Sequence, residues 1–139
     1  MNKIIKNFKN IKYGPAPEDD TEVINWIKKI SSSNKNYING KWNTSKGSKK
    51  IKVINPSTNK KLFNLTISTK KDVDLAVKSA KKAQKKWSSI SPFQRSKYLY
   101  ALARLIQKHS RFLAVLESID NGKPIRETRD IDIPLVARH

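Results

Sequence analysis

The chain has 139 residues and carries 30 Lys and Arg against 11 Asp and Glu, which gives a formal net charge of +19. That length suits one domain or part of a larger one. The chain contains no Cys, which excludes disulfides, thiolate metal sites and a cysteine nucleophile within these 139 residues, and its two His are too few for a His-based zinc site.

The positive charge has two interpretations, and both stay open at this point. A basic surface of this strength is typical of proteins that bind nucleic acid or anionic surfaces. However, Lys, Asn and Ile have A/T-rich codons and together make 52 of the 139 residues, and Lys outnumbers Arg by 24 to 6. This pattern favours compositional bias of the coding DNA, because Arg is the usual residue for bidentate contacts to phosphates and bases.

Residues 1–20 are expected to form an irregular basic arm, because Gly14, Pro15 and Pro17 interrupt regular structure. The arm lacks the apolar segment of a signal peptide, and no apolar run in the chain approaches the ~18 residues of a membrane span. We therefore expect a cytoplasmic protein. A short helix is predicted over 21–30, where apolar residues recur at helical spacing after two Asp residues.

A short meander of strands is predicted next. Asn39-Gly40 between aromatic and β-branched residues indicates a hairpin with a type I′ turn. A second strand is expected over 51–54, a turn over 55–58 and a returning strand over 62–67. Such a small meander must pack on other elements to be stable.

Two longer helices follow. Thr69 and Asp72 form a capping pattern for a helix whose apolar stripe includes Trp87, and a run of Lys lies mostly off that stripe. Those Lys could contact phosphates, although such a run is more often a solvated face. Ser91-Pro92-Phe93-Gln94 starts a second helix that is expected to continue to about Asp120. His109 on this helix is interpreted as a partly buried structural residue.

The C-terminal part is expected to be helical again after a break. Asn121-Gly122 ends the preceding helix, and Pro124 prevents its simple continuation. The last helical stretch starts near Ile125, and Pro134 is expected to interrupt it. Since the apolar segment at His139 has no stop signal, we expect that the chain is truncated there.

The order of these motifs resembles the N-terminal end of an aldehyde dehydrogenase. The segments that carry this resemblance are Tyr37–Trp42 (YINGKW), Val53–Thr58 (VINPST), Asp72–Ala80 (DVDLAVKSA), Trp87, Arg95 and Leu116–Pro124 (LESIDNGKP). The flanks Tyr13–Glu18 (YGPAPE) and Lys123–His139 are similar to the family-sixteen branch. The resemblance covers about residues 13–139, which correspond to only the opening portion of the family's catalytic unit.

The resemblance implies an incomplete α/β fold, in which a β-hairpin or meander and helices flank a Rossmann-like nucleotide-binding domain. Residues 21–139 then form the N-terminal part of an NAD(P)-binding domain, truncated at its C-terminus. In the family a Cys thiolate attacks the aldehyde, an Asn and a backbone N–H hold the oxyanion, hydride passes to NAD or NADP, and a Glu activates water. None of these groups can be placed in this chain, so no catalytic or cofactor-binding residue is assigned and the isolated chain is expected to be inactive without binding NAD or NADP.

The resemblance also implies a weak site for a monovalent cation, with the Ile54 carbonyl and the Asp120 carboxylate among its ligands. Glu117 and Asp120 form a carboxylate pair at helical spacing, for which a structural role is favoured over acid–base chemistry. The expected partners are the remainder of the domain and, in the complete enzyme, further copies of it. The alternative is a non-enzymatic basic module that binds nucleic acid without sequence specificity, or another anionic surface.

Overall fold

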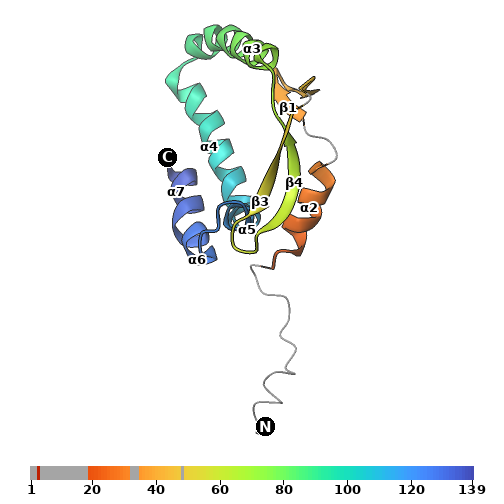
Figure 1. The fold of residues 1–139 in the computed structure, drawn as a ribbon. Helices are drawn as coiled ribbons and strands as arrows, with labels where there is room; N and C mark the ends of the chain where they lie inside the picture. The colour runs from red at the N-terminus through yellow and green to blue at the C-terminus, as the bar shows by residue number, and fades with distance from the viewer. Residues whose placement is uncertain (1–2, 4–18, 32–34, 48) are drawn as a thin grey trace.

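The computed structural model describes residue 3 and residues 19–31, 35–47 and 49–139, so that the predicted arm at 1–20 lies almost entirely outside the described residues. In chain order the elements are α2 (Thr21–Ser31), β1 (Lys35–Ile38), β2 (Lys41–Thr44), β3 (Lys50–Asn55), β4 (Lys60–Thr66), α3 (Lys70–Ser89), α4 (Pro92–Lys108), α5 (Ser110–Asn121), α6 (Ile125–Glu127), the π-helical segment η1 (Thr128–Asp132) and α7 (Ile133–Arg138). Figure 1 shows α3 across one end of the molecule, with α4 leading back from it toward α5 and the β3–β4 pair beside α2.

The strands form two separate antiparallel hairpins, which corrects the predicted meander. β1 pairs only with β2, and β3 pairs only with β4, among the residues that the structure describes. The type I′ turn is confirmed by the positive φ angles of Asn39 (53°) and Gly40 (74°). Between the two hairpins, the segment after β2 contacts the start of α3, where the Ser45 hydroxyl donates a hydrogen bond to Asp72.

A β-bulge lets two consecutive residues of β4 face the same side. Val53 is paired with Phe63 and Ile54 with Lys61, so that Leu62 is the extra residue. In a regular strand Leu62 and Phe63 would point to opposite faces. Here both pack against the core, and the bulge therefore contributes a second apolar side chain from one short strand.

The core lies between α2, the β3–β4 hairpin and α5. Its buried members are Val23 and Ile27 of α2 and Val115 and Ile119 of α5. Trp26 and Phe112 meet edge to face at its margin, with ring centroids 5.4 Å apart. The hydroxyl of the fully buried Thr128 donates to the carbonyl oxygens of Ala114 (3.0 Å) and Ile125 (3.1 Å), and this joins η1 to α5.

The helix predicted over 91–120 is divided at His109, which corrects the prediction of one continuous element. His109 has φ −103° and ψ 17°, and it separates α4 from α5. The bend turns α5 into the core, where Ala114, Val115 and Ile119 are buried, whereas α4 has no buried residue. His109 is itself exposed, so the interpretation of a partly buried His is also wrong.

The C-terminal helix continues through Pro134, although an interruption was predicted there. Pro134 lies in the first turn of α7, where its missing N–H is tolerated. The preceding η1 has wider π-helical turns, in which the Ile133 N–H donates to the Thr128 carbonyl. These wider turns relieve the clash that proline causes with the carbonyl one α-helical turn earlier. None of the helices in the described part of the chain is long and apolar enough to span a membrane.

Candidate functional site

The end of α5 contacts the turn between β3 and β4, and the two residues of the predicted cation site belong to the elements on either side of this junction. Gly122 ends α5 in the left-handed conformation, with φ 79°. A Cβ at this position would lie 2.8 Å from Cγ of Pro56 in the β3–β4 turn. The turn is held by the Asn55 side chain, whose Oδ1 accepts the backbone N–H of Ser57 at 2.9 Å. Ile54 in β3 and Asp120 in α5 therefore belong to elements in direct contact.

The donor groups at this junction suit a hard cation but do not complete a site for one. Asp120 is exposed, and its carboxylate has no hydrogen bond or ion pair to the other described residues. Backbone carbonyl and carboxylate oxygens are ligands that such ions prefer, in sets of about six to eight oxygens for Ca²⁺. The described residues contain no cluster of three or more His, Cys, Asp or Glu that could hold a metal ion.

Glu117 and Asp120 are not joined by a hydrogen bond. The Glu117 carboxylate accepts a hydrogen bond from the Asn121 side chain (3.3 Å), and Oδ1 of the same Asn121 side chain accepts the backbone N–H of Lys123 (2.8 Å). The Ser118 hydroxyl donates to the Lys123 carbonyl at 2.7 Å. These bonds satisfy polar groups at the end of α5. Glu117 takes part in them and Asp120 does not, so the structural role of the carboxylate pair stays a prediction.

Two ion pairs stabilise the segment after α5. Lys123 pairs with Asp132, and the hydrogen bond to that carboxylate raises the pKa of the Lys123 ammonium. The Arg129 guanidinium contacts Asp130 at 2.7 Å, and this hydrogen bond lowers the pKa of the Asp130 carboxyl. All four side chains are near the surface, where such pairs contribute little to stability. Their arrangement offers no acid–base pair.

Asp72 forms the densest polar cluster at the start of α3. Its Oδ2 accepts the Ser45 hydroxyl, the Thr69 hydroxyl and the Thr69 backbone N–H, each at 2.7 Å. Thr69 in turn accepts the Asp72 N–H at 3.3 Å, which completes the predicted capping box. The Ser45 hydrogen bond, followed by those from Thr69, lowers the pKa of the Asp72 carboxyl. The sequence predicted the Thr69–Asp72 pair but missed Ser45, because no local pattern relates positions 27 residues apart.

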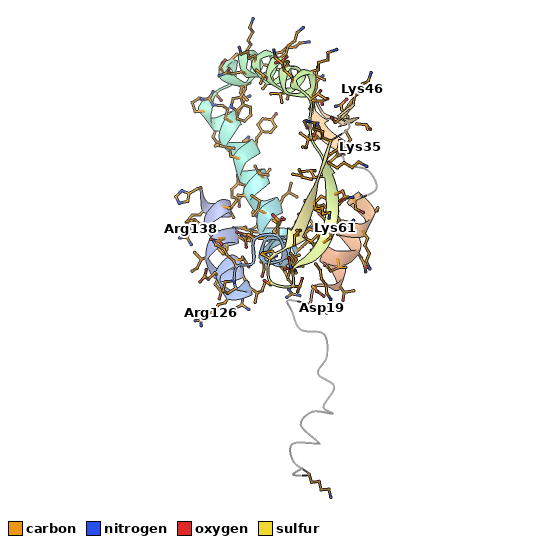
Figure 2. The ribbon with its side chains drawn as sticks, in the orientation of Figure 1. Asp19, Lys35, Lys46, Lys61, Arg126 and Arg138 are labelled. Atoms are coloured by element: carbon orange, nitrogen blue, oxygen red, sulfur yellow. The ribbon has the colours of Figure 1, made fainter. Side chains whose placement is uncertain are left out.

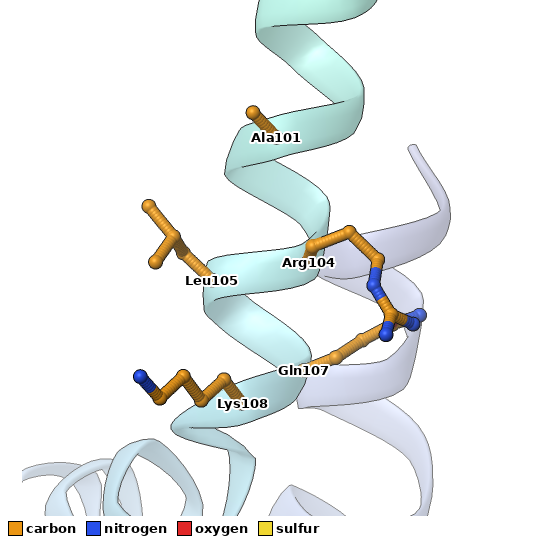
Figure 3. A pocket seen from close by; sticks show the side chains of 5 residues that line it. All are labelled: Ala101, Arg104, Leu105, Gln107 and Lys108. Atoms are coloured by element: carbon orange, nitrogen blue, oxygen red, sulfur yellow. The ribbon is translucent and has the colours of Figure 1, made fainter.

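The larger surface hollows do not contain a catalytic constellation. One hollow is lined by α4 alone, where Arg104 and Gln107 extend toward the side of α7 and are joined by a 2.9 Å hydrogen bond (Figure 3). A second lies between α3 and α4 and is lined by Ala80, Ala83, Gln84, Lys86, Trp87, Ile90 and Tyr98. It is an apolar groove without a carboxylate or a nucleophile.

The described residues do not fit a dinucleotide by themselves. Both sheets are antiparallel hairpins, whereas dinucleotide-binding folds use parallel β-α-β units with a glycine-rich turn at a helix N-terminus. The four glycines of the chain, at positions 14, 40, 47 and 122, do not form such a turn. The described residues thus contain no glycine-rich phosphate-binding turn between a parallel strand and a helix.

Comparison with known proteins gives the same family along most of the chain. Residues 42–139 match the model of the aldehyde dehydrogenase family. Over 112 residues the chain is 43% identical to DhaS of Bacillus subtilis (strain 168), a curated protein named as an aldehyde dehydrogenase. That match covers 79% of this chain and 23% of DhaS.

Solved structures show the same fold in a small part of each neighbour. HpcC from Thermus thermophilus is 27% identical with a TM-score of 0.78, over 92% of this chain and 25% of that protein. A mutant of AldC from Pseudomonas syringae, an aldehyde dehydrogenase solved with NAD⁺ and octanal, is 32% identical with a TM-score of 0.74, over 77% of this chain and 22% of AldC. The chain thus spans about a quarter of the length of the relatives it matches.

Proposed function

The chain belongs to the aldehyde dehydrogenase family, and we propose that it is the N-terminal portion of an enzyme that oxidises an aldehyde to a carboxylic acid with NAD or NADP. The observation that carries this proposal is the family match over residues 42–139, together with a fold shared with a quarter of HpcC. NAD⁺ and octanal are bound by AldC, and the same reaction class is proposed for the complete enzyme here. The aldehyde itself, the choice between NAD and NADP, and membership of the family-sixteen branch stay predictions.

Uncovered apolar surface on α3 and α4 supports this proposal. Large apolar side chains remain exposed along both helices, among them Val73, Val77, Trp87, Phe93, Tyr98, Leu99, Leu102 and Leu105. Neither helix has a buried residue, although each has a complete capping box. Contiguous apolar surface of this kind normally contacts other protein. The remainder of the catalytic domain is the proposed partner of these faces, and association of complete subunits is proposed beyond that.

The proposed contribution of this chain is structural. With no Cys, it cannot supply the thiolate nucleophile, and its antiparallel hairpins do not supply the dinucleotide turn. The core of α2, β3, β4 and α5 holds the α5–turn junction in place. We propose that this junction presents the Ile54 carbonyl and the Asp120 carboxylate to a monovalent cation when other residues complete the ligand set. The cytoplasmic location and the boundary near residue 20 also stay predictions.

The experiment that tests the proposal is sequencing of the transcript beyond the codon for His139, together with assay of the purified 139-residue chain. An open frame that continues into a Cys-bearing segment with a dinucleotide-binding turn supports the proposal. A stop codon at that point contradicts it. In the assay, aldehyde-dependent NADH formation by the 139-residue chain would contradict the proposed structural role.

A further inference from the structure

Helix α3 has two faces of opposite character. Five Lys recur at spacings of three and four residues, so that they lie on one side of the helix, which we call the lysine face; its members are Lys78, Lys81, Lys82, Lys85 and Lys86. Ala76, Ala80, Ala83 and Trp87 recur in the same way on the opposite side. All five Lys are exposed. Figure 2 shows side chains on the outer rim of α3 projecting away from the rest of the molecule.

The charge of the lysine face is not compensated within the described part of the chain. None of its five ammonium groups has a carboxylate within ion-pair distance there. The sequence contains no Asp or Glu between Asp74 and Glu117. From Lys78 to Lys86 the helix rises about 12 Å, so five positive charges gather over that length. This density of positive charge attracts a polyanion. The Lys side chains also repel one another, and a bound polyanion would reduce that repulsion.

We propose that the lysine face of α3 binds the phosphate backbone of duplex nucleic acid without sequence preference. Along about 12 Å of duplex each strand presents about three to four phosphates, which matches the number of Lys that one side of a helix can direct at a strand. Ammonium groups bind phosphates as point charges and lack the planar fork that reads base edges. The lysine face carries no aromatic side chain, so it has no platform on which unpaired bases could stack. These features favour a duplex backbone over single strands.

The position of the apolar residues argues against a lipid bilayer as the occupant. A helix that lies in a membrane interface inserts its apolar face while its Lys reach the adjacent headgroups. In α3 the apolar face is turned toward α4, where the rings of Trp87 and Tyr98 lie 5.8 Å apart beside the groove. The lysine face and the apolar face therefore cannot both contact one bilayer surface.

This inference is independent of the proposed enzyme. Lys86 lies at the edge of the groove between α3 and α4, whereas Lys78, Lys81, Lys82 and Lys85 do not line it, so protein that covers the groove leaves these four Lys directed outward. Failure of the catalytic proposal would leave the lysine face unchanged, and loss of nucleic-acid binding would leave the family membership unchanged. The two proposals can therefore be tested separately.

The test is fluorescence anisotropy with the purified chain and a labelled DNA duplex of about 20 base pairs over a series of KCl concentrations. The test variant is K78Q/K81Q/K82Q/K85Q/K86Q. The matched control is K41Q/K50Q/K52Q/K60Q/K61Q, which removes the same number of exposed charges from the hairpins. Each Lys that contacts a phosphate contributes about 0.9 to the slope of log K against log [KCl], so the test variant should lose about 3 to 4 units of slope and more than about tenfold in affinity. The control should change each value by less than half as much.

Several outcomes would overturn the proposal. Equal losses in the two variants would mean that net charge alone attracts the duplex. Tighter binding to vesicles that contain phosphatidylserine, or to single-stranded DNA, would assign the lysine face to a different partner. Gln has about the same helix propensity as Lys, so far-UV circular dichroism should show unchanged helix content. If it does not, the variant K78R/K81R/K82R/K85R/K86R gives the answer, because retained charge predicts retained binding and its loss contradicts the proposal.

Discussion

Two regions of this chain form helices for different reasons. In the packed region, α2 and α5 bury Val23, Ile27, Val115 and Ile119 against each other and against β4. In the extended region, α3 and α4 bury no residue, yet each begins at a complete capping box. Tertiary burial defines the first pair of helices, whereas local hydrogen bonds and propensity contribute more to the second pair, in which α4 also lies against α7. An apolar stripe therefore indicates a helix in both regions, but it indicates burial within this chain in only one.

The largest effect that separates the two regions is expected from truncation of matched apolar residues. Ile27 is 3% exposed in the packed region, and Leu102 is 53% exposed in the extended region. Ile27→Ala should lower the free energy of unfolding by about 2–5 kcal/mol because it leaves a cavity. Leu102→Ala should change it by about 0.5 kcal/mol or less. Urea denaturation followed by circular dichroism measures both values.

An equal loss of unfolding free energy for Ile27→Ala and Leu102→Ala would contradict the distinction between the packed and the extended region. It would mean that Leu102 is covered in solution, and sedimentation at several concentrations would show whether a second copy covers it. A small cost for Ile27→Ala would place the stability of the fold outside the core described above. Either result would contradict the interpretation of α3 and α4 as uncovered apolar surfaces that contact other protein.

Substitution of Gly122 tests one contact of the packed region by itself, the contact between α5 and the β3–β4 turn. Gly122→Ala should destabilise the chain by about 1–2 kcal/mol from its left-handed backbone, and further because the added Cβ would lie 2.8 Å from Pro56. Gly40→Ala is the matched control, since Gly40 also has a positive φ but has open space around its Cβ position. The difference between the two free energies measures the contact between α5 and the β3–β4 turn.

The double variant G122A/P56A should recover part of that difference. If both glycine variants cost the same, the α5–turn contact is loose. The junction would then be a poor frame for Ile54 and Asp120, and the proposed cation site would lose its support.

The sequence predicted those features that depend on neighbouring residues. The capping boxes at Thr69 and Ser91, the Asn39-Gly40 turn and the Gly122 helix end are all confirmed, because each needs particular residues at fixed short spacings. The family was likewise predicted from motif order and is confirmed by the match over residues 42–139. The cation site at Ile54 and Asp120 stays a prediction.

Features that depend on distant residues were not predicted. The division at His109 follows from burial of α5 against α2, which the α4–α5 sequence alone does not show. The bulge at Leu62 depends on the pairing of β4 with β3. The hydrogen bond from Ser45 to Asp72 joins two segments that only the fold brings together. The π-helical turns before Pro134 begin at Thr128, whose buried hydroxyl donates a hydrogen bond to the Ala114 carbonyl of α5. Each miss therefore reflects a tertiary constraint on an element whose type had been recognised.

The caps of the extended region offer a smaller test. Thr69→Ala removes the side-chain oxygen that accepts the Asp72 N–H, and it should cost about 1 kcal/mol. Thr69→Ser keeps that oxygen and should cost much less. Hydrogen exchange should show faster exchange in the first turn of α3 for the Ala variant, with α5 unchanged. Faster exchange throughout the chain would mean that α3 is tied to the core more tightly than its lack of buried residues indicates.

The smallest expected effect is a pH dependence that arises from Asp72 at the start of α3. Hydrogen bonds from Ser45 and Thr69 hold the pKa of Asp72 below its ordinary value of 3.8. The folded state then binds a proton less readily than the unfolded state, so the Asp72 contribution to stability is fully present above the unfolded pKa and is lost as the pH falls through the folded pKa. Because Asp72 is close to the surface, this contribution is small and sensitive to salt.

Denaturation midpoints measured across pH test this contribution. Asp72→Asn should lower the midpoint at pH 7, and the gap to the native chain should close below about pH 3.8. In a chain that carries Ser45→Ala, adding Asp72→Asn should lower the midpoint at pH 7 by less than it does in the native chain. The pH at which that difference disappears should be higher, since the Ser45 hydrogen bond has the largest influence on the Asp72 pKa. A gap that stays constant from about pH 7 to about pH 2.5 would show that the Asp72 carboxylate charge does not stabilise α3, and the start of the helix would then depend on Thr69 alone.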